Sequence, residues 1–142
     1  MTQQEKDLLL KDLCGRLTYG VKVKIGDSKP ALLTVIEHDE FGWQIGSEDE
    51  FGGMITIIDN VKPYLFPLSS MTEEQYNEMQ TISGKDCMEH MEIEKEWRNN
   101  SPFTHLPLYQ HRVIEFFHKY HFDYRGLIPM GLAIDATGLN IY

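Results

Sequence analysis

Residues 20–67 constrain the fold most, because short β-forming runs alternate there with turn-forming residues. The runs are VKVKI, ALLTVIE, GWQIG, MITII and VKPYLFPL, and segments such as GDSKP, HDEFG and SEDEFGG separate them. The first run alternates apolar and polar residues with a period of two, as a half-buried strand does. These five segments predict an antiparallel curled sheet or a small SH3-like barrel. Pro63 lacks an N–H, which places the last run at an edge or a bulge.

Residues 2–17 predict a helix before this sheet. Thr2 and Glu5 have the spacing of a capping box. Apolar residues then recur at helical spacing and predict one buried stripe, made of Leu9, Leu10, Leu13, Cys14 and Leu17. Gly15 weakens the helix near its end, and we expect the helix to stop by Gly20.

Two helices are predicted after the sheet. One begins after Thr72, with Gln75 completing a capping box and with Met71 and Tyr76 at the spacing of a hydrophobic staple. The other covers 107–121, and its apolar face contains Val113, Ile114, Phe116, Phe117 and Tyr120. The polar stretch 83–105 between them indicates a helix only in its middle, around 87–98.

These elements predict an α+β fold over residues 1–142, arranged as a single compact domain. An N-terminal helix precedes a five-strand antiparallel curled sheet or small SH3-like barrel, and C-terminal helices pack against that sheet. Residues 18–68 form the strand-rich part and 69–142 the mainly helical part.

The composition limits which cellular compartment and which classes of partner we expect for the protein. The chain has 142 residues, a formal net charge of −9 and no apolar run approaching the roughly 20 residues of a membrane span. The N-terminus lacks the apolar core of a signal peptide. Cys14 and Cys87 form no CxxC pair, which is typical of free thiols in a reducing cytoplasm. We expect a cytoplasmic protein that contacts no membrane and does not bind nucleic acid directly.

Two patterns contain residue types that bind metals, but neither predicts a metal site. His111, Glu115 and His118 lie at helical spacing, yet on the side opposite the apolar face, which predicts that they face solvent. Cys87 and His90 are two ligand-type residues with no second pair. We therefore predict no metal, no cofactor and no catalytic residue.

The segments 37–40 (EHDE) and 47–50 (SEDE) are interpreted as solvated acidic turns. Binding of a cation or a basic partner is the alternative, although the regular ligand spacing of a calcium loop is absent.

Six residues are candidates for binding. Trp43, Tyr64 and Phe66 are aromatic residues of the strand region and could line a peptide groove, although a small core also needs its aromatic residues inside. The other three candidates follow the last helix, in the segment HKYHFDYRGLIPMG, and are Asp123, Tyr124 and Arg125.

The same segment is also interpreted as a docking segment. Asp123 is placed to cap a turn over 124–128, and Arg125 to pair with a carboxylate. His121 is expected to end the helix and to favour its dipole when protonated. Core anchors are expected at Leu127, Ile128 and Met130.

Three blocks of the sequence resemble a family of short bacterial proteins with no known activity. The blocks read LLLKDLC-x-RL-x-YGV, KPYL-x-P-x-SSMTEE and FDYRGLI-x-x-GLA, in this order, and they cover about half of the chain. None of the blocks is a catalytic motif, so the resemblance implies no catalytic residue.

The sequence favours a small non-enzymatic module that binds another protein or a peptide. Two alternatives remain open. One is a metal-assisted hydrolase with a site built from His and Asp residues. The other is a nucleic-acid-linked regulator, including an acidic mimic of nucleic acid.

Overall fold

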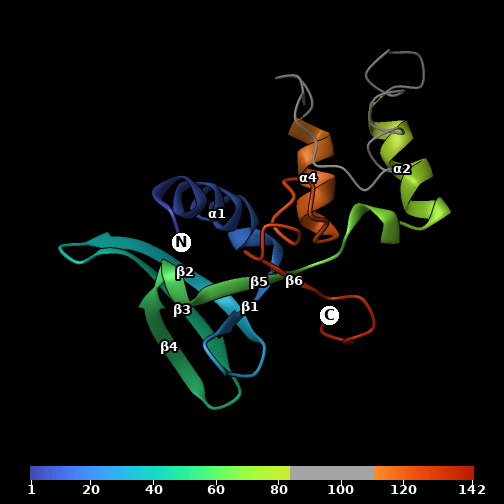
Figure 1. Ribbon diagram of the computed structural model, residues 1–142. Helices are drawn as coiled ribbons and strands as arrows, with labels where there is room; N and C mark the ends of the chain where they lie inside the picture. The colour runs from blue at the N-terminus through green and yellow to red at the C-terminus, as the bar shows by residue number, and fades with distance from the viewer. Residues whose placement is uncertain (84–110) are drawn as a thin grey trace.

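The structure, a computed structural model, describes residues 1–83 and 111–142 (Figure 1). Its helices are α1 (Gln3–Arg16), α2 (Glu73–Ser83) and α4 (His111–Lys119), with 3-10 turns at Leu17–Tyr19, Ile58–Asn60 and Leu68–Ser70. Its strands are β1 (Lys22–Ile25), β2 (Ala31–Asp39), β3 (Gly42–Asp49), β4 (Gly52–Ile57), β5 (Val61–Leu65) and β6 (Ile134–Asp135). The predictions for 87–98 and 107–110, and for Cys87 and His90, lie outside the described residues.

The six strands form one mixed sheet in the order β4-β3-β2-β1-β5-β6. The five predicted strands are present and pair antiparallel with their neighbours. β6 adds to β5 in parallel through Tyr64–Ile134 and Leu65–Asp135. The prediction of a five-strand, wholly antiparallel sheet was therefore wrong in both respects, because β6 adds a sixth strand and pairs in parallel.

The alternative of a small SH3-like barrel was also wrong, because the sheet stays open. Within the described residues, no pairing joins the terminal strands β4 and β6. The 3-10 turn at Ile58–Asn60 leads the chain from β4 back across to β1, so β5 lies on the far side of β1 rather than beside β4. At Pro63 the outer side of β5 is locally an edge, since β6 begins only opposite Tyr64.

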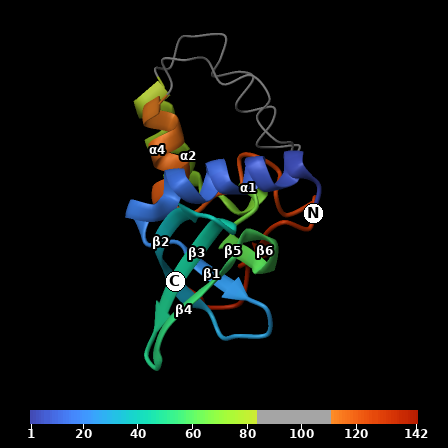
Figure 2. The ribbon, with the colours of Figure 1, turned by 90° about the vertical axis from the view of Figure 1, so that its left-hand side faces the viewer.

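The N-terminal helix α1 crosses the sheet, as Figure 2 shows. The capping box of Thr2 is present: the Glu5 N–H donates to Thr2 Oγ1, and the Thr2 N–H donates to Glu5. Leu9 and Leu13 reach the core between helix and sheet, but Cys14 is exposed. The predicted apolar stripe was therefore only partly correct. The buried positions of α1 are Leu9, Asp12, Leu13 and Arg16.

A second core lies beside the sheet, between α2 and α4. Thr72 and Gln75 exchange both capping-box hydrogen bonds, and the staple residues Met71 and Tyr76 are buried, as predicted. Phe116 and Phe117 of α4 face this core. The members of the core are Leu68, Met71, Tyr76, Met79, Val113, Phe116, Phe117, Phe122 and Tyr124.

The segment after α4 joins the two cores. The Asp123 carboxylate accepts the N–H groups of Leu127 and Ile128, each at 2.8 Å, so the predicted cap is present. Leu127 is fully buried and Ile128 partly buried, but Met130 is exposed, contrary to its prediction as a core anchor. Three glycines with positive φ turn the chain after α4, at 126, 131 and 138.

Candidate functional site

A buried polar cluster connects α1, α4 and the segment after α4. We call it the polar joint and define it as Asp12, Arg16, His118, Tyr124 and Arg125. Arg16 and Asp12 lie one helical turn apart with no solvent exposure, and they form two charge-assisted hydrogen bonds of 2.6 and 3.1 Å. Arg125 Nε donates to the same carboxylate at 3.2 Å, which confirms the predicted pairing of Arg125 with an acid.

The Arg16 guanidinium also holds the chain that follows α4. Its Nη2 donates to the Phe122 carbonyl at 2.7 Å and its Nη1 to the Phe117 carbonyl at 3.4 Å. Both carbonyls lie at or just after the end of α4 and also accept local backbone N–H groups, Phe117 from Phe122 at 2.8 Å and Phe122 from Tyr124 at 3.1 Å. Arg16 thus acts as a C-terminal cap supplied by another helix, and the pair with Asp12 balances its charge.

His118 belongs to the polar joint, so the prediction that it faces solvent was wrong. Its ring is 6% exposed, and its Nε2 lies 3.0 Å from Tyr124 Oη. A Cβ at Gly15 would come within 2.6 Å of the ring, so the glycine lets α1 and α4 approach. α4 is therefore covered on two sides, whereas its own pattern indicates one apolar face. Burial, with the nearby Arg16 charge, lowers the His118 pKa from 6.5 to about 4.

His121 agrees with one part of its prediction and differs from the other. It does end α4, in the left-handed conformation with φ of 58°, and it is buried. Burial, together with Arg16, lowers its pKa to about 4, so the ring is neutral at pH 7. His121 therefore does not supply a protonated imidazole to the helix dipole at pH 7.

The polar joint has the composition of an active site but not its accessibility. Asp123, Tyr124 and Arg125, three of the predicted binding residues, lie in or beside it, and only Arg125 is partly exposed. Burial raises the pKa values of the Asp123 carboxyl and the Tyr124 hydroxyl. In the described residues, no group of three or more His, Cys, Asp or Glu could hold a metal ion. The contacts of the joint fix helices to one another.

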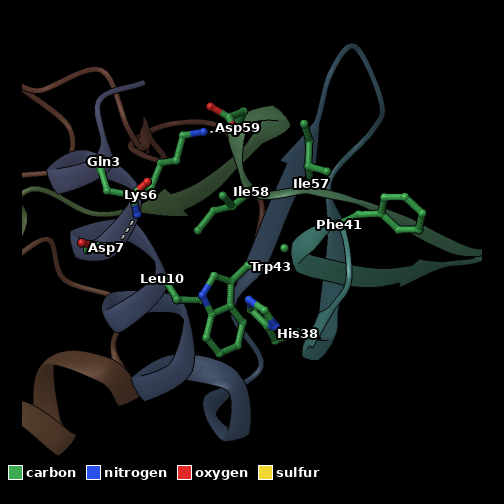
Figure 3. Close-up of a pocket in the computed structure, with 11 residues that line it drawn as sticks. Gln3, Lys6, Asp7, Leu10, His38, Phe41, Trp43, Ile57, Ile58 and Asp59 are labelled. Carbon is green, nitrogen blue, oxygen red and sulfur yellow. Dashed lines mark hydrogen bonds and ion pairs between the residues drawn. The ribbon is translucent and has the colours of Figure 1, made fainter.

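Trp43 lies in a different place, a cleft between α1 and the β2–β3 hairpin. The cleft has a volume of about 480 Å³, and its lining includes Lys6, Asp7, Leu10, His38, Trp43 and Asp59. Figure 3 shows Trp43 and His38 side by side, facing Leu10 of α1. Their rings meet edge to face with centroids 4.9 Å apart. Lys6 and Asp59 pair across the rim at 2.6 Å.

Tyr64 and Phe66 do not line this cleft. Tyr64 is 6% exposed, and burial raises the pKa of its hydroxyl. Phe66 lines a separate cavity near the C-terminus. The structure thus distributes the three predicted aromatic residues over a cleft, a core and a second cavity, and does not bring them together in one groove.

Sequence reasoning missed the exposed sheet formed by β2, β3 and β4, which we call the arm (residues 31–57). It carries eight large apolar side chains that are at least 40% exposed: Leu32, Val35, Phe41, Trp43, Phe51, Met54, Ile55 and Ile57. Among the described residues, no strand pairs with the outer edge of β4. The signal was present in the run MITII, which has no charged residue to protect an edge.

The two hairpin ends of the arm have the same sequence, Asp-Glu-Phe-Gly, at 39–42 and 49–52. In each, the aspartate accepts the phenylalanine N–H at 2.8 Å, and the glycine has a positive φ. Phe41 and Phe51 are consequently exposed by 79% and 78%. The acidic segments 37–40 and 47–50 lie at opposite ends of β3, roughly 25 Å apart for a strand of this length.

Comparisons with known proteins returned no match: no family model matches the sequence, and no curated protein or solved structure is significantly similar. No helix within residues 1–83 or 111–142 has both the length and the apolar character needed to cross a membrane.

Proposed function

We propose that the protein is a non-enzymatic interaction module that binds an extended, basic segment of another protein along the β4 edge of the arm. The observation that carries the proposal is the exposure of β4. Its apolar side chains Met54, Ile55 and Ile57 are 48%, 65% and 44% exposed, on a strand whose outer backbone has no described partner. Such an edge is a template for an added strand.

Exposed apolar residues occupy both faces of the strand. Gly46 of β3 pairs with Ile55 on the neighbouring strand β4 and with Val35 on the neighbouring strand β2. Residues paired across strands lie on the same face, so the Ile55 and Val35 side chains share the outer face of the sheet. Met54 pairs with Ser47 and lies on the opposite face. An added strand would therefore find apolar neighbours for its alternate side chains on each face of the sheet, which is how such complexes gain specificity.

The charge of the arm selects the partner. Residues 31–57 contain six carboxylates and neither lysine nor arginine, so they contribute −6 of the formal net charge of −9. The carboxylates are Glu37, Asp39, Glu40, Glu48, Asp49 and Glu50. A segment with lysine or arginine around an apolar centre complements this field and associates faster at low salt.

The cleft gives the bound segment an anchor. It opens beside the end of β4 and the turn that follows, since Ile57 and Asp59 belong to its lining. The Trp43 ring is an aromatic surface that a cation could contact, and Asp7 and Asp59 supply carboxylates nearby, although Lys6 already pairs with Asp59. A basic side chain at one end of the added strand would fit there.

The test is selection from a displayed library of extended peptides, followed by measurement of Kd for the selected sequences. We expect alternating apolar residues flanked by lysine or arginine, and affinity that falls as salt is raised. Ile55→Lys should weaken binding at least ten-fold, because the added lysine repels a basic segment. Trp43→Ala should weaken binding of peptides that carry the terminal basic residue.

Met130→Lys is the matched control, since Met130 is a 45% exposed apolar residue outside the arm and its replacement should leave Kd unchanged. Selected peptides without basic residues, or peptides that bind Ile55→Lys as tightly as the parent, would contradict the proposal. Sedimentation of the free protein tests whether a second copy of the chain, rather than a partner, occupies the open edge. A dimer abolished by Ile55→Lys would assign the edge to a second copy of the chain instead.

A further inference from the structure

A second cavity of about 470 Å³ lies where the start of α2, the end of α4 and the C-terminal residues meet. We call it the aromatic cavity, after the rings in its wall: Phe66, Tyr120, His121, Phe122 and Tyr142. It shares no lining residue with the cleft. Its size is within the range of about 300–1,000 Å³ that small-molecule sites have.

His121 is the unusual member of this wall. It is 8% exposed, yet its Nδ1 is buried without a hydrogen-bond partner among the described residues. Most buried polar atoms in proteins have such a partner, so an unmet one needs an explanation. The ring is neutral at pH 7, which leaves one nitrogen with a proton to donate and the other able to accept.

The position of this imidazole is fixed from two sides. Its ring stacks on Tyr142, with centroids 4.0 Å apart and an interplanar angle of 14°. Tyr142 is held in turn, because its hydroxyl donates to the Tyr64 carbonyl at 2.6 Å and accepts the Lys22 N–H at 3.1 Å. The backbone of His121 is held as well, because its carbonyl accepts the N–H of Phe66, the residue after β5. The ring is thus pre-positioned, although its nitrogens make no described hydrogen bond.

The electrostatics of the aromatic cavity favour an anion. No aspartate or glutamate belongs to its lining, although the chain carries a net charge of −9. Lys119 lines it, and so does Thr72, where the 11-residue helix α2 begins. A helix N-terminus attracts negative charge, although Glu73 and Glu74 in the first turn of α2 offset part of this attraction. Glu78 offsets part of the Lys119 charge through a 3.0 Å ion pair. The cleft differs from the aromatic cavity, because Asp7 and Asp59 belong to its lining.

We propose that the aromatic cavity binds a small aromatic carboxylate, with its ring against Phe66, Tyr120 and Phe122. The carboxylate would lie toward Lys119 and the start of α2 and accept a hydrogen bond from His121 Nε2, because Nδ1 has almost no accessible surface. This site is independent of the arm, so neither proposal depends on the other.

Phenylacetate is the probe, with benzyl alcohol as its neutral counterpart, in NMR titrations of the whole chain. We expect phenylacetate to shift amide signals around 66–72, 119–122 and 137–142, and to shift the ring nitrogen signals of His121. Benzyl alcohol should bind at least ten-fold more weakly. Absence of saturable binding, equal binding of the alcohol, or shifts confined to the cleft would each overturn the proposal.

Two variants locate the site. His121→Phe keeps a ring against Tyr142 but removes the donor, and should weaken phenylacetate binding at least ten-fold. Thr137→Trp fills the cavity from an exposed position and leaves His121 in place, so it remains informative if His121→Phe folds poorly. Thr34→Trp, at an exposed position of the arm, is the matched control and should bind phenylacetate normally. Unchanged binding by Thr137→Trp would place the ligand elsewhere.

Discussion

The polar joint and the arm invert the usual distribution of side chains in a small protein. In the joint, Asp12 and Arg16 are charged and have no solvent exposure. In the arm, Phe41, Phe51 and Ile55 are apolar and mostly exposed. The difference lies in what satisfies each group. The buried charges have hydrogen-bond partners within the fold, whereas the exposed apolar groups remain largely uncovered, although the Lys29 ammonium lies over the Phe51 ring.

This contrast separates what holds the molecule together from what is available for a partner. A buried ion pair is tolerated when further hydrogen bonds satisfy both partners, and removing one partner leaves the other charge uncompensated. Exposed apolar residues on an edge strand contribute little to the fold and much to an interface. Substitutions in the two regions should therefore have opposite effects on stability and on binding.

The largest effect is expected at the centre of the joint. Arg16→Met removes the partner of a fully buried carboxylate and the donor to the Phe122 carbonyl, so it should lower the free energy of unfolding by about 3–5 kcal/mol. Urea denaturation at pH 7 measures the loss. Lys6→Met breaks the exposed pair with Asp59 and, as the control, should cost less than about 1 kcal/mol.

The double variant Asp12→Leu/Arg16→Met sharpens the same test. Replacing both members of a buried pair by apolar residues leaves neither charge behind, so the double variant should be more stable than Arg16→Met alone. If it were less stable, the carboxylate would have to be stabilised mainly by Arg125 rather than by Arg16.

Lower pH should destabilise the protein through His118 of the joint and His121 of the aromatic cavity, both of which lie outside the arm. The pKa values of His118 and His121 are depressed to about 4 in the folded protein, so the unfolded chain binds protons more tightly below pH 6.5. Their contribution to stability is complete above pH 6.5 and is lost as the pH falls toward 4. Between pH 6.5 and 5 the loss should be about 1.5 kcal/mol for each histidine.

The groups around His118 are Arg16, Asp12, Arg125 and the Tyr124 hydroxyl, and the two arginines oppose its protonation. His118→Gln keeps a hydrogen-bonding side chain and should remove about half of this pH dependence. The raised pKa of Asp123 acts in the opposite direction at the acidic end, so denaturation is best compared above about pH 5. An unchanged pH slope in His118→Gln would contradict its burial as a neutral ring.

The smallest effect on stability is expected in the arm. Ile55→Lys places a charge at a 65% exposed position on an edge strand, so the free energy of unfolding should change by no more than about 0.5 kcal/mol. The same denaturation experiment measures it. A loss of several kcal/mol would show that this face packs against part of the protein, and the inversion between the two regions would then fail.

Much of the fold could be predicted from local patterns. The five strand runs, both capping boxes and the Asp123 cap depend on residues close together in sequence, and all are present. Failures came where the decisive neighbour is distant. β6 has two residues and pairs only because the C-terminal part lies beside β5. His118 is buried because Gly15, more than a hundred residues earlier, allows α1 to approach.

The candidate sites follow the same division. Trp43 was a candidate for binding and does line the cleft, but most of the other lining residues come from α1, β2, β4 and the 3-10 turn that follows β4. Asp12 and Arg16 could have been noticed, since an acid–base pair one turn apart within the Leu9–Leu13 stripe is a signal in itself. Counting only apolar residues concealed it. The burial of His121 had no local signal, and Phe66 was the one predicted binding residue that lines the aromatic cavity.

The sequence by itself determined which of the described segments form the helices and the first five strands, to within a few residues, because periodicity, caps and turn residues act over a few positions. It also determined the acidic character of the arm, which is a matter of composition. Only the tertiary structure decided which charges are buried, which apolar residues remain exposed and which rings surround a cavity. These properties depend on contacts between segments far apart in the chain, and the burial of a side chain is set by what packs over it.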